Sequence, residues 1–315
     1  MKSYAYYPGC SGAGTSIEYD ASTRAVCEAL DIKLVDIPDW NCCGSTPAHT
    51  VDHTLSAALS ARNLAQSESL GLDHILTPCP SCLKNTHNAI EHLKDEHFKQ
   101  MVNALTQRPL TREHSVSSVL QIILEEITPA EITARVKKPL TGLKVVPYYG
   151  CLMTRPGRSM HFDDEENPTS LDLIMEAAGA TVLPFAFKVE CCGGAFGIPR
   201  NDVVAKLGGR IMEMAKLAGA DAVVAACPLC QMNLDMRQGQ IRSKNNLDVN
   251  MPVFYYTQLL GLALGVDEKK LRFEKLITNP KAVLGNIGKN SGAAKPEQTG
   301  TGAEAAAPAK EEAKA

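Results

Sequence analysis

The cysteines constrain this chain most, because ten of its eleven fall into two sets of five that follow one pattern. Each set has a lone cysteine, then an adjacent pair followed by glycine, and finally a Cys-Pro-x-Cys. The first set is Cys10, Cys42, Cys43, Cys79 and Cys82, and the second is Cys151, Cys191, Cys192, Cys227 and Cys230. The gaps inside the sets are 31 and 35 residues in the first and 39 and 34 in the second. This near-constancy predicts a tandem duplication, and two copies are too few for a stacked solenoid.

Residues other than cysteine repeat as well. At an offset of 148 positions, Arg62 falls on Arg210 and Asn85 on Asn233. The wider first gap of the second copy comes from an insertion around residues 155–168.

Short apolar segments and helical patterns alternate in the same order in both copies. In the first copy we expect strands at 2–7, 34–37 and 74–77 and helices at 15–30, 57–69 and from residue 80. In the second we expect strands at 144–149 and 181–183 and a helix at 171–179. Segments 83–106, 115–127 and 252–265 are predicted as further helices. The pattern predicts an α/β fold with short parallel strands, flanking helices and cysteine turns at the strand ends.

The predicted organisation has two pseudo-symmetric domains and a tail. We expect an N-terminal domain at 1–140, in which 84–140 is a helical extension, and a C-terminal domain at 141–288. Residues 289–315 are predicted to be a disordered tail, because from Asn290 onward there is almost no large apolar residue to bury.

Composition narrows the function classes. The net charge is −3 and no basic stretch indicates nucleic acid. No apolar run approaches the roughly 20 residues of a membrane-spanning helix, and the N-terminus has no apolar signal region. We therefore expect a cytoplasmic protein. In that reducing compartment, dense cysteines indicate metal or redox chemistry more than disulfides.

The number of thiols favours iron and sulfur. A structural zinc takes four ligands, and each set offers five. Thiolates are the usual anchors of iron–sulfur clusters, and a Cys-Pro-x-Cys places two of them at a helix start, where the helix dipole stabilises negative charge. Zinc in one or both sets remains the alternative. Cys27, whose counterpart in the second copy is Met175, is interpreted as a buried hydrophobic residue.

Several cations lie near these cysteines in the sequence. Lys84, Arg155, Arg158 and Lys188 could hold an anionic substrate or be solvated surface charges. Arg62 and Arg210, which match between the copies, are predicted to tie a helix to a cysteine loop.

The complete pattern resembles the cysteine-rich CCG domains found in the B subunit of heterodisulfide reductase, over about residues 1–265. The resemblance implies a noncubane [4Fe–4S] cluster in each copy, the first ligated by the first cysteine set and the second by the second set. It implies that a disulfide is reduced or formed between the clusters, with no catalytic side chain identified beyond them. The implied partners are the ferredoxin-type protein and the flavoprotein of such a complex, and a disulfide or thiol substrate or a sulfur-carrier protein.

Two other functions stay open at this stage. One is an electron-transfer subunit of a 2-hydroxy acid or glycerol-phosphate oxidising complex, although this chain lacks the ferredoxin-type cysteine run of many such proteins. The other is a zinc-stapled module that only docks a sulfur-carrier protein.

Overall fold

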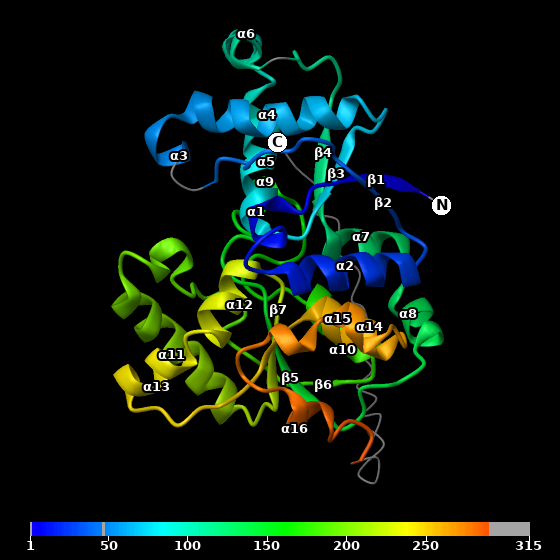
Figure 1. Cartoon of the computed structure of the whole chain (residues 1–315), viewed down its shortest axis with the longest axis vertical. Helices are drawn as coiled ribbons and strands as arrows, with labels where there is room; N and C mark the ends of the chain where they lie inside the picture. The colour runs from blue at the N-terminus through cyan, green and yellow to red at the C-terminus, as the bar shows by residue number, and fades with distance from the viewer. Residues whose placement is uncertain (1, 46–47, 107, 290–315) are drawn as a thin grey trace, which may run out of the picture.

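Two four-stranded parallel sheets form the framework, one from each copy of the cysteine pattern (Figure 1). The computed structural model describes residues 2–45, 48–106 and 108–289. The first sheet has the order β2-β1-β3-β4, and its strands are β1 (Ser3–Tyr6), β2 (Lys33–Asp36), β3 (His74–Thr77) and β4 (Ser115–Ser118). The second has the order β6-β5-β7-β8, with β5 (Lys144–Tyr148), β6 (Thr181–Val182), β7 (Ala222–Ala225) and β8 (Val253–Tyr255). The same order in both sheets confirms the predicted duplicated α/β unit.

Helices fill the connections between the parallel strands. Those of the first copy are α1 (Gly9–Gly12), α2 (Ile17–Ala29), α3 (Ala48–Val51), α4 (His53–Glu68), α5 (Pro80–His92), α6 (Glu96–Leu105), α7 (Val119–Glu126) and α8 (Pro129–Arg135). Those of the second are α9 (Gly157–Met160), α10 (Ser170–Ala177), η1 (Gly194–Gly197), α11 (Asn201–Leu217), α12 (Pro228–Asp235), α13 (Gln238–Asn245), α14 (Tyr256–Ala263), α15 (Glu268–Leu271), η2 (Phe273–Lys275) and α16 (Lys281–Leu284).

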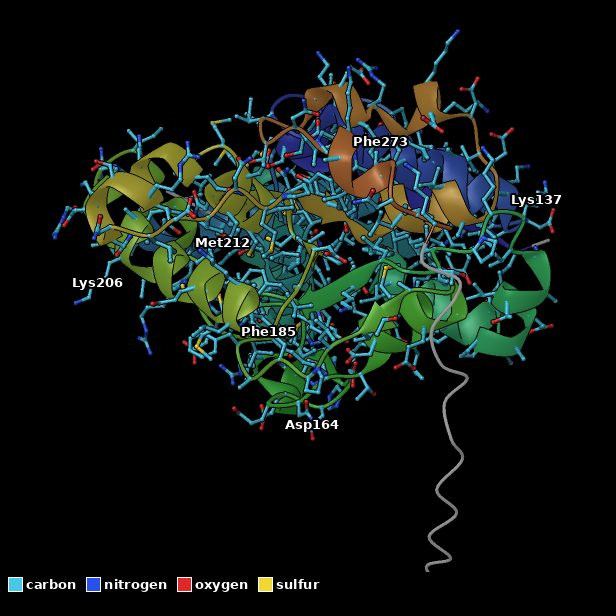
Figure 2. The ribbon with its side chains drawn as sticks, turned by 90° about the horizontal axis from the view of Figure 1, so that it is seen from below. Lys137, Asp164, Phe185, Lys206, Met212 and Phe273 are labelled. Carbon is cyan, nitrogen blue, oxygen red and sulfur yellow. The ribbon has the colours of Figure 1, made fainter. Side chains whose placement is uncertain are left out.

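Each sheet buries its two faces in different cores. Along β1, Tyr4 and Tyr6 belong to a core shared by both copies, whereas Ala5 lies in a core of the first copy alone. The second copy has its own outer core, which includes Phe185 and Met212 (Figure 2). The alternation follows the two-residue period of a strand. The buried cysteines of the two sets belong to the outer cores, which leaves the shared core to join the copies.

The shared core is formed where helices of one copy pack against helices of the other. Helix α2 packs on α14, and α10 packs on α7, so each copy contributes one helix to each pair. Tyr19 of α2 stacks on Tyr255 with ring centroids 4.1 Å apart and donates a hydrogen bond to the Ala226 carbonyl at 3.1 Å. The hydroxyls of Ser22 and Thr257 are 2.7 Å apart in the same layer. These contacts fix the orientation of one copy on the other.

Three predicted helices were wrong in part. Segment 115–127 begins with strand β4, and segment 252–265 begins with strand β8, before α7 and α14 start. In both cases a short strand runs directly into a helix, so one helical period seemed to cover the whole segment. Segment 83–106 is two helices, because α5 ends near Leu93 and Asp95 caps α6 by accepting a hydrogen bond from the Phe98 amide at 2.7 Å.

Other predictions about organisation remain open. The domain boundaries at 140/141 and 288/289 stay predictions, although the shared core spans the first of them. The predicted tail lies outside the described residues, except for Lys289. Among the described residues, no helix is both long and apolar enough to cross a membrane.

Acid should destabilise the fold partly through His74. Its ring packs edge-on to Tyr4, and its Nε2 lies 3.0 Å from Ser117 Oγ. Burial lowers the pKa of His74, so below about pH 6.5 the unfolded chain binds more protons than the folded one and stability falls. We expect urea denaturation to give a lower unfolding free energy at pH 5.5 than at pH 7. His74→Phe, which keeps the ring contact, should show a smaller difference; a variant profile parallel to that of the unchanged protein would contradict this.

Candidate functional site

The ten cysteines of the two sets lie in turns that follow the ends of parallel strands. Cys10 follows β1 in α1, Cys79 follows β3 and caps α5, and the pair Cys42–Cys43 follows β2. The second copy repeats this arrangement after β5, β6 and β7. Carboxyl ends of parallel strands meet at one edge of a sheet, which brings three separate turns of each copy together as the sequence predicted.

Four thiols of the first set lie near enough to shift one another's pKa. Interaction between neighbouring thiols couples Cys42 to Cys43, Cys43 to Cys82 and Cys82 to Cys79. It lowers the pKa of Cys43 and Cys79 and raises the pKa of Cys42 and Cys82. Cys10, which is exposed, is close enough to interact electrostatically with Cys42.

The second set is gathered in a similar way. Cys192 Sγ lies 3.5 Å from Cys230 Sγ, and this contact lowers the pKa of Cys192 to about 7. Interaction with the thiols of Cys192 and Cys227 raises the pKa of Cys230, and interaction with the thiol of Cys191 raises the pKa of Cys151. The structure therefore brings the turns that carry each predicted set to one region, with three buried thiols per set, and the ligand role of the ten cysteines stays a prediction. The described residues contain no group of three or more His, Cys, Asp or Glu side chains that could hold a single metal ion.

A glycine before each lone cysteine permits close approach to the last thiol of the set. Gly9 and Gly150 have φ values of 70° and 73°. A Cβ on Gly9 would lie 2.9 Å from Cys82 Sγ, and one on Gly150 would lie 2.7 Å from Cys230 Sγ. Both the positive φ and the contact exclude larger residues.

A buried tyrosine fixes the loop that carries each cysteine pair. Tyr7 Oη donates to the Asn41 carbonyl at 2.8 Å, and Tyr148 Oη donates to the Glu190 carbonyl at 2.6 Å. Each carbonyl belongs to the residue just before the pair, and each tyrosine stands three residues before the lone cysteine. Burial raises the pKa of both tyrosines, so both remain protonated donors. The sequence analysis did not predict a role for these tyrosines, although their matching positions in the two copies indicate one.

The repeated asparagines hold the pairs from the other side. Asn85 Nδ2 donates to the Cys43 carbonyl, and Ser60 Oγ donates to the same carbonyl at 2.9 Å. In the second copy, Asn233 Nδ2 donates to the Gly194 carbonyl at 3.0 Å and lies 3.6 Å from Cys192 Sγ. One polar side chain per copy thus connects the helix of the Cys-Pro-x-Cys to the pair.

Backbone amides after each pair point at sulfur. The Gly44 amide donates to Cys42 Sγ at 3.4 Å, and the amides of Gly193 and Gly194 donate to the sulfur atoms of Cys191 and Cys192 at 3.3 and 3.4 Å. N–H donors directed at sulfur favour the thiolate form, which is the form that binds metal.

The predicted role of the repeated arginines agrees with their contacts. Arg62 on α4 donates to the Asp39 carbonyl and to Asn41 Oδ1, both in the loop before the first pair. Arg210 on α11 lies over the Phe187 ring, 5.7 Å from its centroid, in the loop before the second pair. Cys27 is fully buried in the shared core, which confirms its interpretation as a hydrophobic residue.

The nearby cations divide by their contacts. Lys188 is buried and paired with Asp172 at 2.7 Å, and Arg155 is paired with Glu166 at 2.6 Å. Lys84 donates to Asn88 and, at 3.2 Å, to Ser159 Oγ of the second copy. The side chain of Arg158 lies outside the described part of the structure.

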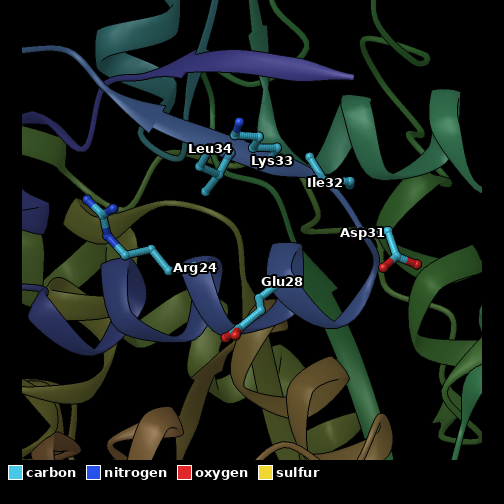
Figure 3. A pocket seen from close by; sticks show the side chains of 6 residues that line it. All are labelled: Arg24, Glu28, Asp31, Ile32, Lys33 and Leu34. Atoms are coloured by element: carbon cyan, nitrogen blue, oxygen red, sulfur yellow. The ribbon is translucent and has the colours of Figure 1, made fainter. Parts of the chain in front are cut away.

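The two cysteine sets flank one seam between the copies. Helix α1, which carries Cys10, contacts α12, which carries Cys230; α5, which carries Cys82, contacts α9 in the loop after Cys151. Each set therefore lies against the other copy. A separate hollow of about 330 Å³ between α2 and β2 is lined by none of the cysteines (Figure 3). Three of its lining residues form ion pairs, Arg24 with Asp36, Glu28 with Lys270 and Asp31 with Arg135.

The effect on stability of the close contact at Gly150 can be measured separately from the effect of its positive φ. Gly219 has a similar φ of 77° with nothing within 4 Å of an added Cβ. Gly219→Ala should therefore cost about 1 kcal/mol of strain alone, and Gly150→Ala should cost about 1–3 kcal/mol more through its clash with Cys230 Sγ. Urea denaturation of both variants measures the difference. Equal losses would show that the contact is unimportant.

Comparison with known proteins shows which family and which relatives this chain resembles. The family model of the cysteine-rich domain CCG matches residues 4–86 and 145–235. The chain is 36% identical over 274 residues to the 8-methylmenaquinol:fumarate reductase membrane anchor subunit of Wolinella succinogenes, covering 86% of this chain and 95% of that protein. It is 29% identical to the B subunit of the Ferredoxin/F(420)H(2)-dependent CoB-CoM heterodisulfide reductase of Methanosarcina acetivorans, covering 87% and 93%.

A solved structure shares the fold. The crystal structure of a hypothetical protein from Helicobacter pylori superposes with a TM-score of 0.68 at 13% identity, over 88% of this chain and 52% of that one. The resemblance to the B subunit of heterodisulfide reductase is thus confirmed by homology, and the match of the cysteine-rich model to both copies shows that this chain belongs to the CCG family.

Proposed function

We propose that this chain is the iron–sulfur subunit of a heterodisulfide-reductase-like complex, in which each cysteine set holds one noncubane [4Fe–4S] cluster. The observation that carries the proposal is that the three cysteine turns of each copy follow strands of one sheet, beside the seam where α1 contacts α12 and α5 contacts α9. Both named relatives are subunits of reductases, which supports an electron-transferring role. A cytoplasmic location remains a prediction.

The residues around the thiols fit such a group. Each quintet exceeds the four ligands of a tetrahedral zinc, and its donors are all sulfur, as iron–sulfur clusters require. The amides of Gly44 and Gly193 point at sulfur, and Gly9 and Gly150 keep side chains out of the space beside the last thiol of each set. When bound, a cluster would supply one-electron redox steps and an iron that substrate sulfur could contact.

The residues of the chain would hold each cluster, orient the loops that bind it and keep water away from it. Tyr7 and Tyr148 fix the pair loops, and Asn85 and Asn233 tie those loops to the helices that begin at the Cys-Pro-x-Cys motifs. The outer cores exclude water from the three buried thiols of each set. Rigid positioning of this kind is the usual contribution of a protein to cofactor chemistry.

The substrate proposed for the seam is a disulfide. Its reduction to two thiols consumes two electrons and two protons, so two neighbouring one-electron centres suit it. The reciprocal contacts of α1 with α12 and of α5 with α9 support a position from which one small molecule could reach both sets. The proposed electron partners are a ferredoxin-type protein and a flavoprotein of the same complex.

Iron analysis tests the cysteine assignment. Anaerobically purified protein should contain about eight irons and about eight sulfides per chain, and Cys42→Ser or Cys191→Ser should each lower the iron to about four. Cys27→Ser is the matched control, because Cys27 is buried in the shared core away from both sets. Stoichiometric zinc, or an equal loss of iron in Cys27→Ser, would contradict the assignment.

Turnover by the native complex tests the substrate. With a reduced viologen as electron donor, the complex should reduce disulfides, and either single-set variant should reduce that rate to background. The Cys27→Ser complex should keep its rate. A fully loaded complex that reduces no disulfide would refute the substrate and leave the iron assignment standing.

A second candidate is favoured by one observation, the relative that is 36% identical over 95% of its length. On that reading the chain is an electron-transferring subunit of a quinol:fumarate reductase. The proteins that co-purify from the native host distinguish the two, since fumarate reduction by an associated flavoprotein would favour the second candidate.

A further inference from the structure

The repeated asparagines Asn85 and Asn233 direct their amide groups at different atoms of the two cysteine pairs. Asn85 Nδ2 donates to the Cys43 carbonyl. Asn233 Nδ2 donates to the Gly194 carbonyl at 3.0 Å, and its second hydrogen faces Cys192, whose carbonyl oxygen lies 3.5 Å away and whose Sγ lies 3.6 Å away. A distance of 3.5 Å is long for a hydrogen bond to oxygen, whereas sulfur is larger and accepts from further away. The second copy therefore directs a side-chain N–H group at a thiol.

This difference between the copies has its cause on the neighbouring helix. In the first copy, the hydroxyls of Ser56 and Ser60 on α4 lie 3.2 and 3.3 Å from Asn85 Nδ2. At the offset of 148 positions, the counterparts of these serines on α11 are Val204 and Gly208. Neither residue has a side-chain hydroxyl. Serine oxygens therefore compete for the amide hydrogens in the first copy, and this competition is missing in the second.

Burial strengthens the contact in the second copy. Asn233 is 0% exposed and Cys192 is 2% exposed, whereas Asn85 is half-buried. Two N–H donors approach Cys192 Sγ, the Asn233 amide at 3.6 Å and the Gly194 backbone amide at 3.4 Å. The carbonyl of Gly194 can only accept, so the nitrogen of the Asn233 side chain, and not its oxygen, faces the pair. In such a low-dielectric environment, a donor directed at a thiolate acts more strongly than it would in water.

We propose that Asn233 raises the reduction potential of the cluster held by the second cysteine set, so that the two otherwise matched sets are inequivalent. This inference rests on the proposed function, because it concerns a cluster bound by those thiolates. Reduction is a one-electron transfer from a ferredoxin-type donor, in which no proton or leaving group moves. The added electron makes the cluster more negative, and an N–H donor directed at a ligating sulfur stabilises that charge. The amide of Asn85 is directed at oxygen atoms, so the first set lacks this contribution.

Redox titration of the second set alone tests the role of Asn233. The Cys42→Ser protein, purified anaerobically as the full chain, should keep only the second cluster, which can be followed by EPR and visible absorption. Adding Asn233→Leu should lower its midpoint potential by about 59 mV, a tenfold change in a one-electron equilibrium, as expected for a lost hydrogen bond to a charged group.

The matched control is Asn245→Leu in the same Cys42→Ser background. Asn245 belongs to the same copy, and its amide donates to the carbonyls of Ala205 and Ile241 at 2.8 Å, away from the cysteine pair. Its loss should leave the midpoint potential unchanged. An equal fall in the Asn245→Leu protein would show that the effect of Asn233→Leu is a general loss of packing, and would overturn the inference.

A second variant keeps Asn233 and changes only its neighbour. Val204→Ser supplies the hydroxyl that the first copy has at this position, so it should draw the amide away from sulfur and lower the second-set potential. An unshifted potential in Asn233→Leu, or in Val204→Ser if Asn233→Leu loses its iron, would overturn this inference while a content of about four irons leaves the proposed function standing. Absence of iron from the protein without substitutions would overturn both.

Discussion

The need to bring five sulfur atoms from three distant turns to one place governs this structure. Parallel strands meet that need, because their carboxyl ends share one edge of the sheet and each can carry a cysteine turn. The last step depends on glycine. At Gly9 and Gly150, a positive φ and the missing Cβ let the backbone of the first turn lie against a thiol of the third. With any larger residue, the lone cysteine would be held away from its set.

The shared core packs the two copies, and with them the two cysteine sites, against each other. Because α2 packs on α14 and α10 on α7, neither copy can bury its inner sheet face without the other. The stacked pair Tyr19 and Tyr255 fixes this arrangement. The same packing holds the turn of Cys10 against the helix that carries Cys230. The packing between the copies therefore both stabilises the fold and brings the two sites near each other.

Much of this could be predicted from the sequence, because the cysteine pattern is both repeated and chemically specific. The duplication, the parallel α/β fold, the cysteine turns at strand ends and the buried state of Cys27 all follow from spacing and composition. Strands β4 and β8 were missed, because each is only a few residues long and continues into a helix without a breaking residue. Tyr7 and Tyr148 were missed because a tyrosine near a strand end looks like core, and only its hydrogen bond distinguishes it.

The central claim is that both quintets enclose iron and sulfide. The most direct measurement is a crystal structure of the anaerobically prepared protein, with diffraction recorded above and below the iron absorption edge. The account predicts two separate groups of iron peaks, one within bonding distance of each cysteine set, on opposite sides of the seam. A single tetrahedral ion in either set, or iron bound away from these thiols, would contradict it.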